Sequence, residues 1–174
     1  MTNPPRVLIV MGSDSDLPVM EETRSALNSL GISCQMTVAS AHRTPARALR
    51  LAREAQEKGI QVIIAGAGAA AHLAGVMAAH TILPVIGVPI DSSPLRGWDA
   101  LLSTVQMPPG VPVATVSVGK AGARNAAILA AQILGLADPE IQRRLVLARE
   151  EAVGVIEERA ARVEGGSGDT PTAR

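Results

Sequence analysis

The chain has 174 residues, a formal net charge of +0 and no extended block of Lys or Arg, which argues against a nucleic-acid-binding surface. Hydrophobic residues make up 47% of the chain but include one Trp and neither Phe nor Tyr, so the core must consist of small aliphatic side chains and Met. Because each of these side chains buries little area, we expect contacts between subunits to supply part of the stability.

Apolar, β-branched runs alternate along the chain with segments of helical periodicity. In chain order, the runs predict strands at residues 6–11, 32–39, 61–65, 84–90 and 111–118. The segments between and after them predict helices at residues 17–30, 45–58, 73–80, 98–105, 121–134 and 139–162. Pro45 and Pro139 stand at first helical positions, where proline is favoured.

This alternation predicts an α/β fold with a parallel sheet between two layers of helices. Right-handed crossovers make it a three-layer sandwich, doubly wound in the flavodoxin-like manner. We expect residues 1–163 to form a single domain. Residues 164–174 are rich in Gly, Ser and Thr, and we expect them to form a disordered tail.

Three of the predicted strands end in polar or very small residues. These strand ends are residues 12–16, 40–43 and 66–72. The carboxyl ends of parallel strands lie at the same edge of a sheet, where ligands bind in open α/β folds. The sequence therefore predicts that these three turns form one site.

The first two turns suit an anionic ligand. Gly12 lets the backbone approach closely, and Ser13 offers a hydroxyl at a helix N-terminus. Asp16 could accept hydrogen bonds from sugar hydroxyls, or it could be an ordinary helix N-cap. Arg43 could form two parallel hydrogen bonds to a phosphate, or it could be a solvated surface residue.

His42 is the candidate proton carrier, because an unperturbed imidazole titrates near pH ~6.5. A lone His is more often structural, but His42 lies beside Arg43 on a predicted ligand-binding turn. We expect His80 to be a packing residue, whereas His72 is either a polar contact at a helix start or part of the site. In the third turn, the nearly bare backbone around residues 66–68 offers a surface for a flat ring.

Two other functions remain open on the residues alone. Gly66, Gly68 and Ala71, followed by Asp91 at the end of the next predicted strand, resemble a dinucleotide-binding fingerprint, which would indicate an oxidoreductase. That reading leaves the other two polar strand ends unexplained. The second alternative is a nucleotide-binding module without catalytic activity.

Several other classes of site are not expected. The single Cys34 excludes an intramolecular disulfide, and the histidines lack a known metal-ligand spacing, so we predict no metal. Residues 1–5 lack the pattern of a signal peptide, and no uninterrupted apolar run reaches the ~18 residues of a membrane span. We therefore expect a cytoplasmic protein.

Together, these turns resemble those of the class I family of N5-carboxyaminoimidazole ribonucleotide mutases, which act in purine biosynthesis. The matching segments are Gly12-Ser13-Asp14-Ser15-Asp16, Ser40-Ala41-His42-Arg43-Thr44-Pro45, Gly66-Ala67-Gly68, Ala70-Ala71-His72-Leu73, residues 84–89, residues 105–108, residues 110–116 and Asn125-Ala126-Ala127. The resemblance extends from about residue 6 to about residue 134.

The chain departs from the family pattern at Ala69, Ala74 and Ala100. Class II relatives carboxylate aminoimidazole ribonucleotide directly, and Gln106-Met107-Pro108 is the segment that resembles class I.

The resemblance implies a cofactor-free mutase that moves a carboxylate from the exocyclic nitrogen of an imidazole ribonucleotide to ring carbon C4. Carbon dioxide would be released and recaptured, with His42 acting first as acid and then as base. The implied substrate-binding residues are Gly12, Ser13, Asp14, Asp16, Ser40, Ala41, Arg43, Gly68, Ala70, Ala71, His72 and Leu73. The resemblance places Ser13, Asp16 and Arg43 on the ribose phosphate side. It further implies a homo-octamer in which C-terminal helices pack on neighbouring subunits.

Overall fold

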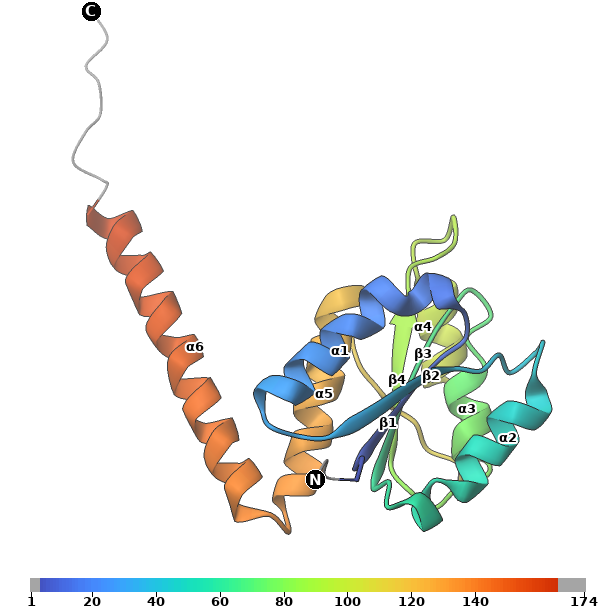
Figure 1. Ribbon diagram of the computed structural model, residues 1–174. Helices are drawn as coiled ribbons and strands as arrows, with labels where there is room; N and C mark the ends of the chain where they lie inside the picture. The colour runs from blue at the N-terminus through green and yellow to red at the C-terminus, as the bar shows by residue number, and fades with distance from the viewer. Residues whose placement is uncertain (1–3, 166–174) are drawn as a thin grey trace, which may run out of the picture.

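Five parallel strands form a single sheet in the computed structural model, which describes residues 4–165 (Figure 1). The strands are β1 (Val7–Met11), β2 (Cys34–Val38), β3 (Val62–Gly68), β4 (Val85–Ile90) and β5 (Ala114–Thr115). Their order in the sheet is β2-β1-β3-β4-β5, which is the flavodoxin-like order. The predicted doubly wound α/β fold is therefore confirmed.

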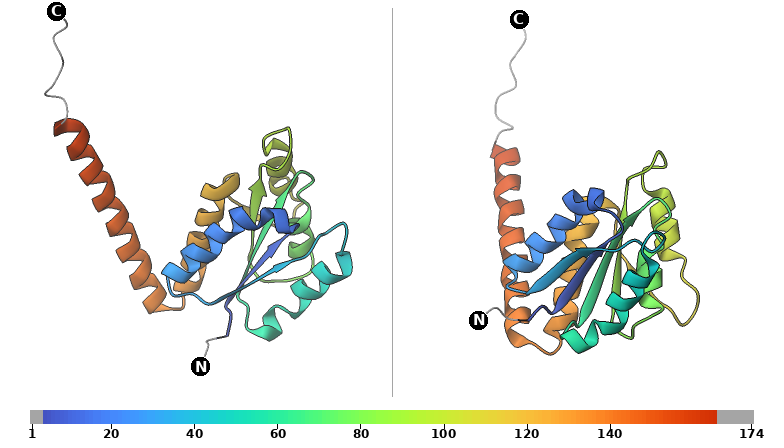
Figure 2. Two further views of the ribbon diagram at one scale, coloured as in Figure 1. Left: turned by 45° about the horizontal axis from the view of Figure 1, so that its top comes forward. Right: turned by 45° about the vertical axis from the view of Figure 1, so that its right-hand side comes forward.

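Helices cover both faces of the sheet, as Figures 1 and 2 show. The elements on one face are α1 (Leu17–Ser29) and α5 (Gly119–Gly135), and those on the other are α2 (Pro45–Glu54), α3 (Leu73–Ala78) and α4 (Trp98–Val105). Two 3-10 turns, η1 (Asp14–Asp16) and η2 (Gln56–Lys58), adjoin α1 and α2, and α6 (Pro139–Gly165) follows α5. None of the helices within residues 4–165 is both long and apolar enough to cross a membrane.

The core is aliphatic on both sides of the sheet. In β1, Val7, Ile9 and Met11 pack toward α1 and α5, whereas Leu8 and Val10 pack toward α2 and α3. Helix α5 packs on the core mainly through alanines, of which the buried ones are Ala123, Ala126, Ala127, Ala130 and Ala131. Such small side chains let helix and sheet approach closely, which explains how a chain without Phe or Tyr forms a packed interior.

The strand boundaries differ from the predicted ones at two places that matter for the site. The third strand continues past Ala65 to Gly68, because Ala67 and Gly68 still pair with Pro89 and Ile90 of β4. The fifth strand, predicted over residues 111–118, is reduced to Ala114–Thr115. Pro112, near the start of the predicted strand, has no backbone N–H to donate to a neighbouring strand. The strand also lies at the edge of the sheet, where it can pair on one side only.

Helix α6 starts where it was predicted but ends later. Asp138 caps it, because its Oδ1 accepts hydrogen bonds from the backbone N–H groups of Glu140 (3.2 Å) and Ile141 (3.4 Å). The helix continues through Gly165, so the first two residues of the predicted tail, 164 and 165, are helical. Residues 166–174 of that tail lie outside the described part of the chain.

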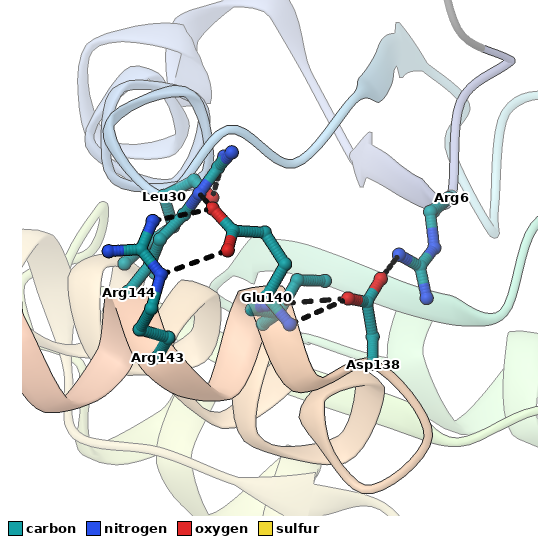
Figure 3. Close-up of polar contacts among 7 residues, drawn as sticks. Arg6, Leu30, Asp138, Glu140, Arg143 and Arg144 are labelled. Carbon is teal, nitrogen blue, oxygen red and sulfur yellow. Dashed lines mark hydrogen bonds and ion pairs between the residues drawn. The ribbon is translucent and has the colours of Figure 1, made fainter.

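The first turns of α6 attach it to the body of the molecule (Figure 3). Arg6 Nη1 donates a hydrogen bond to Asp138 Oδ2 at 2.5 Å, and Arg144 Nη1 donates one to the Leu30 carbonyl at 3.0 Å. Within the described part of α6, Ile141 is the only buried residue. Leu145 and Ala148 also pack against the core, and beyond them the helix projects away from the sheet and its flanking helices (Figure 1).

We expect Glu140→Gln to weaken the dependence of stability on pH between pH 4.5 and about 2. Hydrogen bonds from Arg143 and Arg144 lower the pKa of Glu140 from 4.5 to about 2 (Figure 3). A carboxyl group whose pKa is lowered by folding stabilises the folded state above its unfolded pKa, and this contribution is lost as the pH falls through the folded value. Acid unfolding followed by circular dichroism measures the effect.

The matched control for this prediction is Glu150→Gln, on the same helix. Glu150 is exposed and forms no ion pair within residues 4–165. Its variant should follow the wild-type acid-unfolding curve. If Glu140→Gln also followed that curve, the Glu140 ion pairs would contribute nothing to acid stability.

Candidate active site

A cavity of about 300 Å³ opens at the carboxyl edge of the sheet, where the predicted turns meet. It lies around the ends of β1 and β3, where the chain order of the strands switches direction. The predicted residues that line it are Gly12, Ser13, Asp16, Ser40, Ala41, His42, Arg43, Gly68, Ala70 and Leu73. Three predicted residues lie outside the lining: Asp14, Ala71 and His72. Three lining residues were not predicted: Ser15, Ala67 and Ser92.

The turn after β1 is braced by its own side chains. The backbone N–H of Ser13 donates to Asp16 Oδ2 at 3.1 Å, and Ser15 N–H donates to Ser13 Oγ at 3.3 Å, which together form a capping box. Asp14 is exposed and accepts a hydrogen bond from the Ser13 hydroxyl at 3.1 Å. Asp14 therefore shapes the turn from outside the cavity.

Asp16 does not cap α1, as the sequence also allowed, but closes the capping box of the preceding 3-10 turn η1. It occupies the N-cap position of α1 but makes no capping hydrogen bond to that helix. Only 5% of the residue is exposed. Burial raises the pKa of its carboxyl group, while the Ser13 N–H and the nearby Arg43 charge act in the opposite direction. A buried acceptor at the cavity wall can bind hydroxyl groups of a ligand.

Arg43 reaches from the turn after β2 to the turn after β1. Its Nη2 donates to the Gly12 carbonyl at 3.2 Å, while its backbone N–H donates to Ser40 Oγ at 3.1 Å. Thr44 stabilises the same turn, because its hydroxyl accepts from Ser40 N–H at 2.9 Å. The guanidinium group is exposed and lies at the cavity, so its remaining donors can bind an anion.

His42 and His72 form a pair across the site. His42 Nε2 lies 2.8 Å from His72 Nδ1, and the ring centroids are 5.0 Å apart at an interplanar angle of 80°. One of the two nitrogens donates and the other accepts, so a hydrogen bond joins the two rings. His72 thus belongs to the site through His42 although it does not line the cavity. His80, by contrast, follows α3 and donates to the Val76 carbonyl of that helix at 2.8 Å, in keeping with a structural role.

Neighbouring side chains occupy the space on the Cβ side of Gly66 and of Gly68. A Cβ at Gly66 would lie 2.3 Å from the sulfur of Met20, and one at Gly68 would lie 1.8 Å from Ser92 Oγ. Both positions require glycine because a neighbouring side chain occupies the space above the backbone. Gly68 nevertheless lines the cavity, so the expectation that a flat ring lies against this turn stays a prediction.

The same geometry argues against the dinucleotide-binding alternative. That motif needs its glycines in a tight turn between a strand and a helix N-terminus. Here Gly66 and Gly68 belong to β3 itself, and α3 begins only at Leu73.

Comparisons with known proteins identify the family to which the chain belongs. The family model described as "AIR carboxylase" matches residues 6–153. This chain belongs to the AIR carboxylase family. The match runs from β1 into α6 and includes every residue of the cavity lining. The family that the sequence motifs resemble is thereby confirmed.

Relatives of this AIR carboxylase family member include two proteins named N5-carboxyaminoimidazole ribonucleotide mutase. The protein from Pyrococcus horikoshii is 54% identical over 160 residues, which cover 92% of this chain and 89% of the relative. The protein from Escherichia coli K12 is 54% identical over 143 residues, or 82% and 85% of the two chains. The crystal structure of Treponema denticola PurE superposes with a TM-score of 0.82 at 30% identity, and covers 91% of this chain and 98% of that one.

The backbone is strained at Ala69, one of the three departures from the family pattern. Ala69, where the family usually has Gly, has a φ of 49°, which is a conformation that disfavours a side chain. We expect Ala69→Gly to raise the free energy of unfolding by up to about 1 kcal/mol. Ala70→Gly is the control: Ala70 has no positive φ, so the added chain entropy should destabilise the protein. Urea unfolding measures both; a destabilised Ala69→Gly would contradict the strain.

Proposed function

We propose that this chain is an N5-carboxyaminoimidazole ribonucleotide mutase of purine biosynthesis. The observation that carries the proposal is the convergence of His42 with Ser13, Asp16 and Arg43 in one cavity. These groups supply a proton carrier, a hydroxyl, a buried acceptor and a cation. Relatives that are about half identical to this chain carry that enzyme name.

The reaction moves a carboxylate within one ribonucleotide, and His42 transfers the protons. As the bond between the exocyclic nitrogen and the carboxylate breaks, His42 donates a proton to the departing nitrogen and carbon dioxide is released. Ring carbon C4 then attacks carbon dioxide, and His42 removes the proton from C4. Protons balance because His42 ends in its starting state. No cofactor is needed, because the electron-rich ring carbon is itself the nucleophile.

The cavity suits both ends of such a substrate. Ser13 and Arg43 bind the phosphate, and Asp16 accepts hydrogen bonds from the ribose hydroxyls. The residues proposed to surround the ring and carbon dioxide are Ser40, Ala41, Gly68, Ala70, Ala71, His72 and Leu73. Gly12 and Asp14 contribute by shaping the turn that presents Ser13. Small apolar groups such as Ala41 and Ala70 suit free carbon dioxide, which has no charge to bind.

We further propose that the protein acts in the cytoplasm as a homo-oligomer, and that the octamer implied by the family resemblance is its functional form. Helix α6 supports this proposal, because Val146, Val153 and Ile156 are exposed on one side of a helix that projects from the body. A face of this kind is covered when it packs on a neighbouring subunit.

An ultraviolet absorbance assay tests the reaction. It compares turnover of the N5-carboxylated nucleotide with direct carboxylation of aminoimidazole ribonucleotide in the presence of bicarbonate. Direct carboxylation is the second candidate, because the family description names a carboxylase. The proposed mutase consumes the N5-carboxylated nucleotide without added bicarbonate. Turnover only with bicarbonate would establish the second candidate instead.

A further inference from the structure

Ser92 is the lining residue that comes from the end of β4, on the side of the cavity away from β2. Within residues 4–165, no group forms a hydrogen bond with its hydroxyl. The adjacent Ser93 differs, because its hydroxyl accepts a hydrogen bond from Leu95 N–H at 3.1 Å and so holds the loop together. The Ser92 hydroxyl thus remains available to a ligand, whereas that of Ser93 is used by the fold.

The Ser92 side chain is held in place although its hydroxyl is unpaired. A Cβ at Gly68 would lie 1.8 Å from Ser92 Oγ and 2.8 Å from Ser92 Cβ, so this side chain packs directly on the end of β3. The backbone N–H of Ser92 donates to the Ile90 carbonyl at 3.0 Å, and Ile90 pairs with Gly68 in the sheet. The absence of a side chain at Gly68 therefore allows Ser92 to reach the cavity.

The order of the strands places Ser92 at a particular end of the substrate. Ser13 and Arg43, the residues proposed to bind the phosphate, follow β1 and β2. Ser92 follows β4, which lies two strands beyond β1 in the sheet. Neighbouring strands lie about 4.8 Å apart, so Ser92 is about 10 Å from the end of β1 and about 14 Å from the end of β2 along the edge. A ribonucleotide held by its phosphate at β1 and β2 would extend its ring toward β3, where His72 lies, and toward Ser92.

We propose that the Ser92 hydroxyl is a substrate-positioning contact that donates a hydrogen bond to the carboxylate of the bound imidazole ribonucleotide. The inference rests on the proposed function. In that role, Ser92 distinguishes the carboxylated nucleotide from aminoimidazole ribonucleotide, which lacks the carboxylate. It also fixes the carboxylate from the side opposite the Ser40–Arg43 turn, which keeps the reacting groups beside His42.

Substitution of Ser92 by Ala tests the contact. We expect Ser92→Ala to weaken binding of 4-carboxy-5-aminoimidazole ribonucleotide by about tenfold, because a hydrogen bond to a charged group is lost. Binding of aminoimidazole ribonucleotide should change by less than about twofold. The control variant is Ser93→Ala, which removes a hydroxyl from the same loop outside the cavity and should leave both dissociation constants unchanged. Isothermal titration calorimetry measures all four dissociation constants, and thermal unfolding reports whether each variant is folded.

The outcomes separate this inference from the proposed function. If wild-type enzyme turns over the N5-carboxylated nucleotide and Ser92→Ala binds the carboxylated product as the wild type does, the role of Ser92 is refuted alone. If Ser92→Ala weakened the binding of both nucleotides equally, the proposed role would also be refuted. Ser92 would then line the cavity without a specific contact to the carboxylate. If the wild type shows no turnover, the proposed function fails, and the inference fails with it.

Discussion

Replacing His42 by Asn is expected to lower kcat by about 10²–10⁴-fold while leaving nucleotide binding within about twofold of the wild type. Asn keeps a polar group of similar size but cannot carry a proton near neutral pH. Both proton transfers in the proposed reaction depend on His42, and among residues 4–165 the other titratable side chains that line the cavity are Asp16 and Arg43. Steady-state turnover and the dissociation constant for aminoimidazole ribonucleotide measure the two effects.

His80→Asn is the matched control for His42→Asn. His80 makes its hydrogen bond to Val76 within its own segment and lies outside the cavity lining. Its replacement should lower the unfolding temperature and leave kcat unchanged. If His42→Asn retained normal kcat, the proposed acid–base role would be wrong, and the pairing of His42 with His72 would be a structural contact only.

The arrangement of the sheet could be predicted from the sequence because its signals are local. Each buried strand is a short run of β-branched residues, and the alternation with helices leaves few possible topologies. Once the strand order is given, the turns at residues 12–16 and 40–43 must lie together, as they do in the cavity. The location of the site could therefore be inferred from the strand topology, without knowledge of any interatomic distance.

What could not be predicted depends on contacts between distant segments. The packing of Met20 on Gly66 and of Ser92 on Gly68 joins residues that no local pattern connects. The hydrogen bond between His42 and His72 likewise spans two turns, and its geometry depends on how far β3 extends. Ser92 was missed for this reason: nothing in its own loop distinguishes it from Ser93.

Replacing Arg43 by Ala is expected to raise KM by about 10- to 100-fold, because a hydrogen bond between charged groups contributes about 1.5–3 kcal/mol. The effect on kcat should be smaller, since the phosphate is bound alike in the ground and transition states. Arg43→Lys should recover only part of the affinity, because an ammonium group cannot form the two parallel hydrogen bonds of a guanidinium group. Steady-state kinetics of the three proteins separates KM from kcat.

Arg47→Ala separates the phosphate role of Arg43 from a general effect of removing a cation. Arg47 lies four residues after Arg43, in α2, and its Nε donates to the Val38 carbonyl at 2.9 Å and its Nη2 to Thr37 Oγ1 at 2.8 Å. Its loss should lower stability at this strand and leave KM unchanged. Equal rises in KM for Arg43→Ala and Arg47→Ala would mean that the local positive charge attracts the substrate without a specific contact. An unchanged KM for Arg43→Ala would instead limit Arg43 to its bond with Gly12 and to its electrostatic effect on Asp16.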